Sequence, residues 1–166
     1  MQRPYGMAPA AFDAYIRACF HAGVSPDRVR QTIGNAPASK GFHKRDGILL
    51  DGAQPVPYCA AVDLDTGNLK PEQIRALLLE LARQGFAAWY RYTGSFTTNR
   101  HIHAIFVGLR MKLALQRQVL AFLNNRDGLA DDGPEKFWTP PTELDPPIRA
   151  AWLRANPKGS KYLEGR

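Results

Sequence analysis

Cysteine, long apolar runs and export signals are all scarce in this chain of 166 residues. With only Cys19 and Cys59 present, neither a disulfide framework nor a thiolate zinc cluster can form, although a single Cys19–Cys59 bridge stays open. No apolar run approaches the roughly 20 residues that a membrane helix needs. The first residues lack the apolar core of a secretory signal, which suits either cytoplasmic synthesis with later release to a cell wall or an unusual export route, and the localisation stays open.

Common nucleotide-binding and esterase motifs are also absent, since no G-x-x-x-x-G-K-[ST], G-x-G-x-x-G or G-x-S-x-G run occurs. What is present is typical of one globular domain, with 45% hydrophobic and 22% charged residues. Lys and Arg total 22 against 15 Asp and Glu, which gives a formal net charge of +7. This excess favours an anionic partner, such as nucleic acid, a membrane surface or an acidic wall polymer.

Hydrophobic periodicity predicts a mixture of helices and strands. The expected helices span residues 9–22, 25–33, 69–84 and 111–124, with a further short one near 148–153. The expected strands span residues 58–64, 86–92 and 100–108, and the last two should pair antiparallel because a short polar turn joins them. The stretch 34–58 is rich in Gly and Pro, which indicates an irregular segment with a short hairpin around residues 48–50.

A histidine pair is the most suggestive chemical feature. His101 and His103 are two residues apart on an expected strand, so both imidazoles should face the same side. His43 lies in the irregular stretch, and Asp63 ends an apolar strand where a carboxylate needs a partner or a metal. A hydrolytic zinc site has three protein ligands and one open position. His43, Asp63 and one histidine of the pair would supply those ligands, and the other histidine could transfer a proton.

The order of these motifs resembles the D-alanyl-D-alanine carboxypeptidase-like family of zinc peptidases. The matching segments are Ser39-Lys40-Gly41-Phe42-His43, Ala61-Val62-Asp63-Leu64, the run from Gly85 to Arg91, and His101-Ile102-His103-Ala104. The similarity is greatest to the peptidoglycan-hydrolase branch of bacteria and their phages, and it spans roughly residues 36–130. It implies zinc ligands at His43, Asp63 and His103, with His101 as the catalytic imidazole.

The resemblance also implies a fold class and a domain organisation. The family fold is α+β, a small antiparallel sheet with helices packed against it, which agrees with the expected elements. A zinc peptidase-like domain would then cover residues 1–130, with N-terminal helices over 9–33 and the motif core over 36–130. Residues 131–166 form a Pro-rich C-terminal extension, which we expect to pack on the core through Phe137, Trp138 and Trp152.

Two departures from the family pattern affect the expected chemistry. Nineteen residues, Lys44 to Val62, separate the first histidine from the aspartate, whereas simpler members have only a few. Many members place a glutamate base three residues before the last histidine, and here that position is Arg100. The arginine that binds the substrate carboxylate is not identified by position, and the candidates are Arg28, Arg30, Arg45 and Arg91.

The favoured function is therefore a Zn²⁺-dependent peptidase that acts on peptidoglycan peptides, of the carboxypeptidase or the endopeptidase type. One alternative is a catalytically inactive wall-binding module of the same fold, as the insertion and Arg100 would allow. A less favoured alternative is a metal-dependent nuclease of the His-hydrophobe-His type. Those nucleases need a tyrosine nucleophile, and the one tyrosine that follows His103 is Tyr162, in the C-terminal extension.

Overall fold

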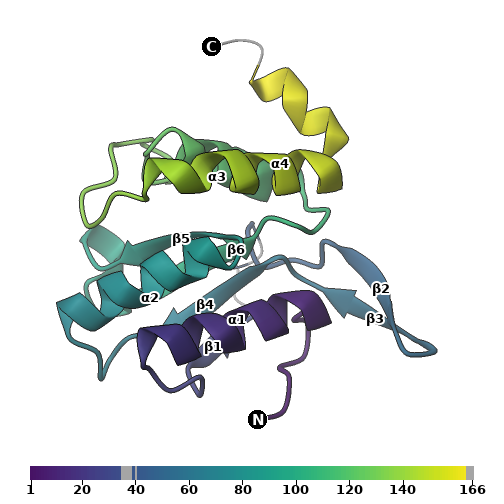
Figure 1. Ribbon diagram of the computed structural model, residues 1–166, viewed down its shortest axis with the longest axis horizontal. Coiled ribbons are helices and arrows are strands. Elements are labelled where there is room, and N and C mark those ends of the chain that lie inside the picture. The colour runs from purple at the N-terminus through teal and green to yellow at the C-terminus, as the bar shows by residue number, and fades with distance from the viewer. Residues whose placement is uncertain (35–38, 40, 164–166) are drawn as a thin grey trace.

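A four-stranded antiparallel sheet lies between two pairs of helices (Figure 1). The computed structural model describes residues 1–34, 39 and 41–163, so Lys40 and residues 36–38 of the expected motif core lie outside the described residues. The strand order is β1 (Val29–Gln31), β4 (Ala61–Asp65), β6 (His101–Phe106) and β5 (Phe86–Arg91). Every neighbouring pair is antiparallel, which confirms the α+β class and the predicted β5–β6 pair.

The four α-helices of the described chain lie where the hydrophobic periodicity of the sequence predicted them. They are α1 (Pro9–Ala22), α2 (Pro71–Arg83), α3 (Leu113–Leu123) and α4 (Asp145–Ala155). The described residues also form three short 3-10 helices: η1 (Gly94–Phe96), η2 (Thr142–Leu144) and η3 (Pro157–Tyr162). Within the described residues, none of the helices combines the length and the apolar character needed to cross a membrane.

Alternation along the central strands creates two separate cores. One set of side chains, including Leu64, Phe86 and Ile102, packs against α1 and α2. The opposite set, including Trp89 and Ile105, packs against α3 and α4. Because neighbouring residues face opposite sides, the alternation places Asp63, Arg91, His101 and His103 on the second face. These four polar side chains therefore lie on the face of the sheet that faces α3.

The predicted helix over residues 25–33 is wrong, because this segment forms a tight turn followed by β1. The Ser25 side chain accepts a hydrogen bond from the Asp27 amide at 3.3 Å, and the Arg28 amide donates to the Pro26 carbonyl at 2.9 Å. Ser, Pro and Asp begin turns as readily as helices. Pairing with β4 decides the outcome, and it sets Gln31 opposite Asp63.

The long insertion contains the predicted hairpin, formed by β2 (Gly47–Asp51) and β3 (Gln54–Tyr58). Asp46 fastens its base to the core. The buried Asp46 carboxylate accepts hydrogen bonds from the Ala60 amide at 2.7 Å, the Lys112 amide at 2.8 Å and the Lys112 ammonium at 2.9 Å. The insertion is thus tied to β4 and to the start of α3.

Replacing Asp46 should destabilise the protein strongly. In Asp46→Ala, two amides and an ammonium lose their acceptor, and breaking a buried ion pair in this way costs about 3–5 kcal/mol. The matched control is Asp51→Ala in the same hairpin, whose partly exposed ion pair with Arg3 should contribute at most about 1 kcal/mol. Urea unfolding of both variants measures the difference, and equal midpoints would contradict the role of Asp46.

The C-terminal extension packs on the domain as expected. Trp152 is fully buried in the core on the α3 and α4 side of the sheet, and Trp138 packs against both cores. Phe137 packs against the core on the α1 and α2 side. Both cysteines are free, and they lie in different cores. The Cys19–Cys59 bridge that the sequence left open is therefore absent, and burial raises the pKa of Cys59 to about 12.

Candidate metal centre

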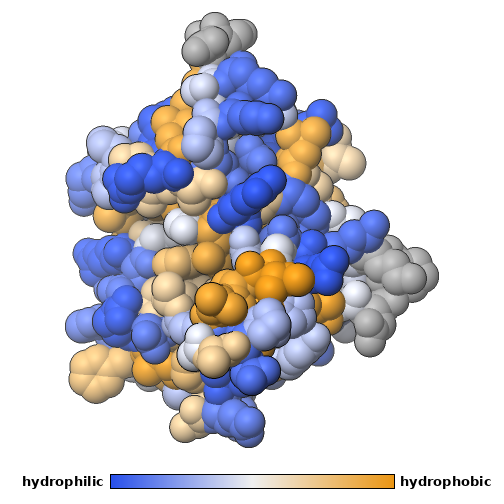
Figure 2. Space-filling view, turned by 90° about the vertical axis from the view of Figure 1, so that its right-hand side faces the viewer, coloured by the Kyte–Doolittle hydropathy of each residue, from blue (hydrophilic) through white to orange (hydrophobic). Residues whose placement is uncertain are grey.

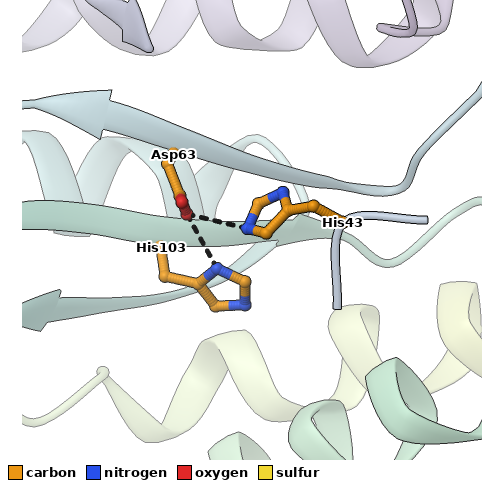
Figure 3. Close-up of side chains that lie close together, drawn as sticks. All are labelled: His43, Asp63 and His103. Atoms are coloured by element: carbon orange, nitrogen blue, oxygen red, sulfur yellow. Dashed lines mark hydrogen bonds and ion pairs between the residues drawn. The ribbon is translucent and has the colours of Figure 1, made fainter. Parts of the chain in front are cut away.

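Three segments far apart in the sequence bring two histidines and an aspartate together (Figure 3). Asp63 and His103 face each other across the β4–β6 register, and His43 reaches them from the loop before β2. His43 Nε2 lies 3.1 Å from Asp63 Oδ1, and His103 Nδ1 lies 3.0 Å from the same oxygen. The predicted ligands His43, Asp63 and His103 thus form one compact cluster, with both histidine side chains nearly fully buried.

Both histidines are held from behind by an oxygen acceptor. His43 Nδ1 lies 2.9 Å from the Thr32 carbonyl oxygen. His103 Nε2 lies 2.9 Å from Oε1 of Gln118, and the amide nitrogen of Gln118 donates to the Gly128 carbonyl at 3.2 Å. An N–H donated to such an acceptor fixes the tautomer and leaves the other ring nitrogen free to ligate, as in histidines that bind metals.

This arrangement places more acceptors around the rings than neutral histidines can satisfy. A neutral imidazole carries one N–H, whereas His43 and His103 each face an oxygen at both nitrogens. Burial lowers the pKa of His103, and the hydrogen bond and charge of Asp63 only partly offset that effect. The protonated form of His103 is therefore disfavoured. A cation between the inner nitrogens and the carboxylate would resolve the conflict.

Asp63 has the properties of an anionic ligand. Burial acts to raise the pKa of Asp63, but hydrogen bonds from His103 and His43 outweigh it and hold that pKa well below its usual range. The second carboxylate oxygen lies 3.5 Å from the Gln31 amide nitrogen, and Ser39 donates to the other end of that amide. The carboxylate is thus ionised and oriented.

The donor set fits zinc in both type and spacing. Zinc accepts imidazole nitrogen and carboxylate oxygen at about 2.0–2.2 Å, which puts tetrahedral ligand atoms about 3.3 Å apart. The observed separations of 3.0 and 3.1 Å are close to this value, and one ligand atom from each residue lies within 4.8 Å of the others. With His43, Asp63 and His103 as its ligands, a tetrahedral zinc would keep one position open.

Gln118 should tune the affinity of this site for zinc. Gln118→Leu keeps a similar volume but removes the acceptor of His103 Nε2, so we expect zinc binding to weaken about 10- to 100-fold. The matched control is Gln116→Leu on the same helix, because the Gln116 amide donates to the Met111 carbonyl and does not touch the histidines. Competition with a chromophoric chelator measures both affinities, and equal values would contradict the role of Gln118.

A cavity of about 400 Å³ opens beside the cluster and is lined by two further ionisable side chains, His101 and Arg91. His101 Nδ1 lies 2.7 Å from the Asn99 carbonyl oxygen, so its Nε2 is left free, at 3.8 Å from Asp63 Oδ1. Arg91 donates from Nη1 to the Asp127 carbonyl at 2.6 Å, while its buried Nη2 has no partner among the described residues. Burial lowers the pKa of Arg91 to about 10, so the guanidinium is charged at neutral pH.

Of the four arginine candidates, Arg91 alone is among the described residues that line the cavity. Arg28 is buried elsewhere and donates to the Ser25 and Asp65 carbonyls. Arg30 and Arg45 do not line the cavity, and Arg30 donates to the Asn99 side chain instead. Arg100, which occupies the position of the glutamate base in the resembling family, is exposed.

Tyr162 and several supporting residues complete the surroundings. Tyr162 lines a neighbouring hollow of about 620 Å³ that does not contain the histidines. This hollow shares five lining residues with the cavity: Phe42, Gln118, Gly128, Leu129 and Ala130. Sequence reasoning missed Gln31, Thr32 and Gln118. Gln118 carried a signal, since it is a polar residue between Leu115 and Phe122 on the buried face of α3.

No protein-family model, curated protein or solved structure matches this chain. The geometry of the centre therefore carries the functional argument.

Proposed function

We propose that this protein is a Zn²⁺-dependent peptidase that hydrolyses the peptides of bacterial cell-wall peptidoglycan. One observation carries the proposal: His43 and His103 converge on one oxygen of Asp63 while each outer nitrogen faces an oxygen acceptor. The choice of wall peptides rests on the resemblance of the motifs to the D-alanyl-D-alanine carboxypeptidase-like family.

Four residues have proposed roles in zinc binding and proton transfer. His43, Asp63 and His103 would hold the zinc, which polarises the scissile carbonyl and makes a water molecule acidic near neutral pH when bound. His101 would accept the proton of the attacking water at its free Nε2 and pass it to the leaving amine. Apart from Asp63, the described residues that line the cavity include no carboxylate, so His101 takes the place of the glutamate base.

Arg91 supports a substrate with a carboxylate near the scissile bond. Its guanidinium is charged, its Nη2 is buried and unpartnered among the described residues, and the Arg91 side chain lines the same cavity as His101 and His103. A guanidinium that lines a cavity and keeps a donor without a partner is suited to a carboxylate ligand. This favours the carboxypeptidase type, in which the substrate ends one residue after the cleaved bond.

Loss of Arg91 should impair substrate binding selectively. We expect Arg91→Gln to lower kcat/KM about 10- to 100-fold, mainly through KM, because a hydrogen bond to a charged group contributes about 1.5–3 kcal/mol. A peptide with an amidated C-terminus should be poor for the unaltered protein and equally poor for the variant. Arg45→Gln, outside the cavity, is the control. If Arg91→Gln still discriminates acid from amide, Arg91 does not bind the carboxylate.

The direct test combines zinc-loaded protein with two substrates, a synthetic peptide ending in D-Ala-D-Ala and isolated peptidoglycan. Mass spectrometry should detect free D-Ala, and a chelator should abolish its release until zinc is restored. Loss of crosslinked fragments without free D-Ala would assign the endopeptidase type. Zinc binding without any cleavage would favour the inactive wall-binding module, and Mn²⁺-dependent cutting of a labelled DNA strand would favour the nuclease.

A further inference from the structure

The β2–β3 hairpin has a backbone edge that nothing in the described chain covers. The two-residue loop of Gly52 and Ala53 makes Asp51 and Gln54 the hydrogen-bonded pair next to the turn. Since paired residues alternate along an antiparallel ladder, Leu50↔Pro55 and Ile48↔Pro57 are non-hydrogen-bonded pairs. The backbone groups of those four residues therefore point away from the hairpin, toward its two outer edges.

The two outer edges differ in their capacity to add a strand. Along β3, Pro55 and Pro57 have no N–H to offer, so that edge is closed. Along β2, Ile48 and Leu50 each present an N–H and a carbonyl, and β2 pairs with β3 alone in the described residues. The open edge is therefore confined to one strand.

Large apolar side chains accompany the open edge. Ile48 is 58% exposed and Leu50 is 72% exposed, while Leu49 between them packs against the core. Figure 2 views the side on which the hairpin projects and shows hydrophobic residues gathered near its centre. An open strand edge next to exposed aliphatic side chains favours pairing with another strand.

We propose that β2 of a second copy of this chain covers this edge, in an antiparallel pair about a two-fold axis at Leu49. In this register Ile48 of one copy lies opposite Leu50 of the other, and the reverse pair is equivalent. The outward N–H and carbonyl groups of both residues then form four backbone hydrogen bonds between the copies. The Ile48 side chain of each copy packs against the Leu50 side chain of the other.

Charge and closure also favour a second copy over an unrelated strand. At each end of the paired strands, the tip of one hairpin, which carries Asp51, approaches the base of the other, where Lys44 and Arg45 are exposed, so charges of opposite sign come near each other. Asp51 also pairs with Arg3 of its own chain. The prolines of β3 close the far edges of the resulting four-stranded sheet, so pairing stops at a dimer. Since the interface is small, dimerisation should depend on concentration.

Light scattering after size exclusion, over a range of protein concentrations, tests this dimer. The apparent mass should rise toward twice the monomer mass as concentration increases, and the Ile48 and Leu50 amides should become protected from hydrogen exchange over the same range. Leu50→Pro removes one outward N–H that has no role in the folded hairpin, and Ile48→Lys places a charge on the edge; both should remain monomeric. Phe20→Lys is the matched control, because Phe20 is 80% exposed on α1, and it should still dimerise.

Three outcomes would overturn the dimer. The first is a monomeric mass at every concentration with fast exchange at both amides. The second is a dimer that persists in Leu50→Pro and Ile48→Lys, since the contact would then lie elsewhere. The third is protection that appears only when a wall peptide is added, which would make the edge a peptide-binding site. Zinc content should be unchanged in all variants, so this test is independent of the metal centre.

Discussion

Purified protein should contain about one zinc per chain, and His103→Ala and Asp63→Asn should contain almost none after dialysis. Each substitution removes one of three ligand atoms that converge within 4.8 Å of one another. Peptide hydrolysis should fall at least roughly a thousandfold, because a Lewis acid contributes several kcal/mol and each 1.4 kcal/mol is about tenfold in rate. Elemental analysis and the release of D-Ala measure both effects.

The fourth histidine provides the control for this experiment. His21 lies in the last turn of α1, on the other side of the sheet from the cluster, so His21→Ala should keep its zinc. Zinc retained in His103→Ala and Asp63→Asn would contradict the assignment of these two residues as zinc ligands. The histidine pair would then be a hydrogen-bonded pair on a basic domain.

The same variants should separate the effect of zinc on stability from its effect on catalysis. A ligand that binds only the folded state stabilises it by about 2.7 kcal/mol at a hundred times its dissociation constant. Unaltered protein should therefore melt at a higher temperature in the presence of zinc. His103→Ala should show no such shift, because its remaining ligands, His43 and Asp63, no longer close the site.

The sequence predicted most of the fold because its strongest patterns are local. The apolar stripe of α2 and the aromatic strand β5 each specify one element, with Gly85 between them. The error at residues 25–33 arose where a local signal was ambiguous. Ser25 and Pro26 suit a helix start, but β1 owes its existence to pairing with β4, more than thirty residues later.

That His43, Asp63 and His103 would lie together was predictable, because strand alternation and motif order are features of the sequence. His101 and His103 had to share a face, and an aspartate closing an apolar strand needed a partner. The supporting residues were not predictable in the same way. Gln31 and Thr32 act through β1 and the turn after it, and Gln118 acts from a helix that follows the strands, so their contacts depend on tertiary packing.

The His101→Ala variant should keep its zinc but have a much lower kcat. This combination distinguishes a proton-transfer group from a metal ligand. His101 Nε2 lies 3.8 Å from Asp63 Oδ1, whereas the inner nitrogens of His103 and His43, the proposed ligand atoms, lie 3.0 and 3.1 Å from it. Its ring is held through Nδ1 by the Asn99 carbonyl, which leaves Nε2 free, and the His101 side chain lines the cavity. General base catalysis contributes about 10²- to 10⁴-fold, so kcat should fall by that factor.

Rescue by added imidazole makes the assignment of His101 specific. The truncated side chain leaves space in a cavity of about 400 Å³, where free imidazole can accept the proton instead. We expect imidazole to restore part of kcat in His101→Ala and to leave His103→Ala inactive, because the latter lacks zinc. Loss of zinc from His101→Ala would instead make His101 a fourth ligand. The other described residues that line the cavity would then include no base to replace the missing glutamate. An inactive wall-binding module would become the better explanation of what the protein does.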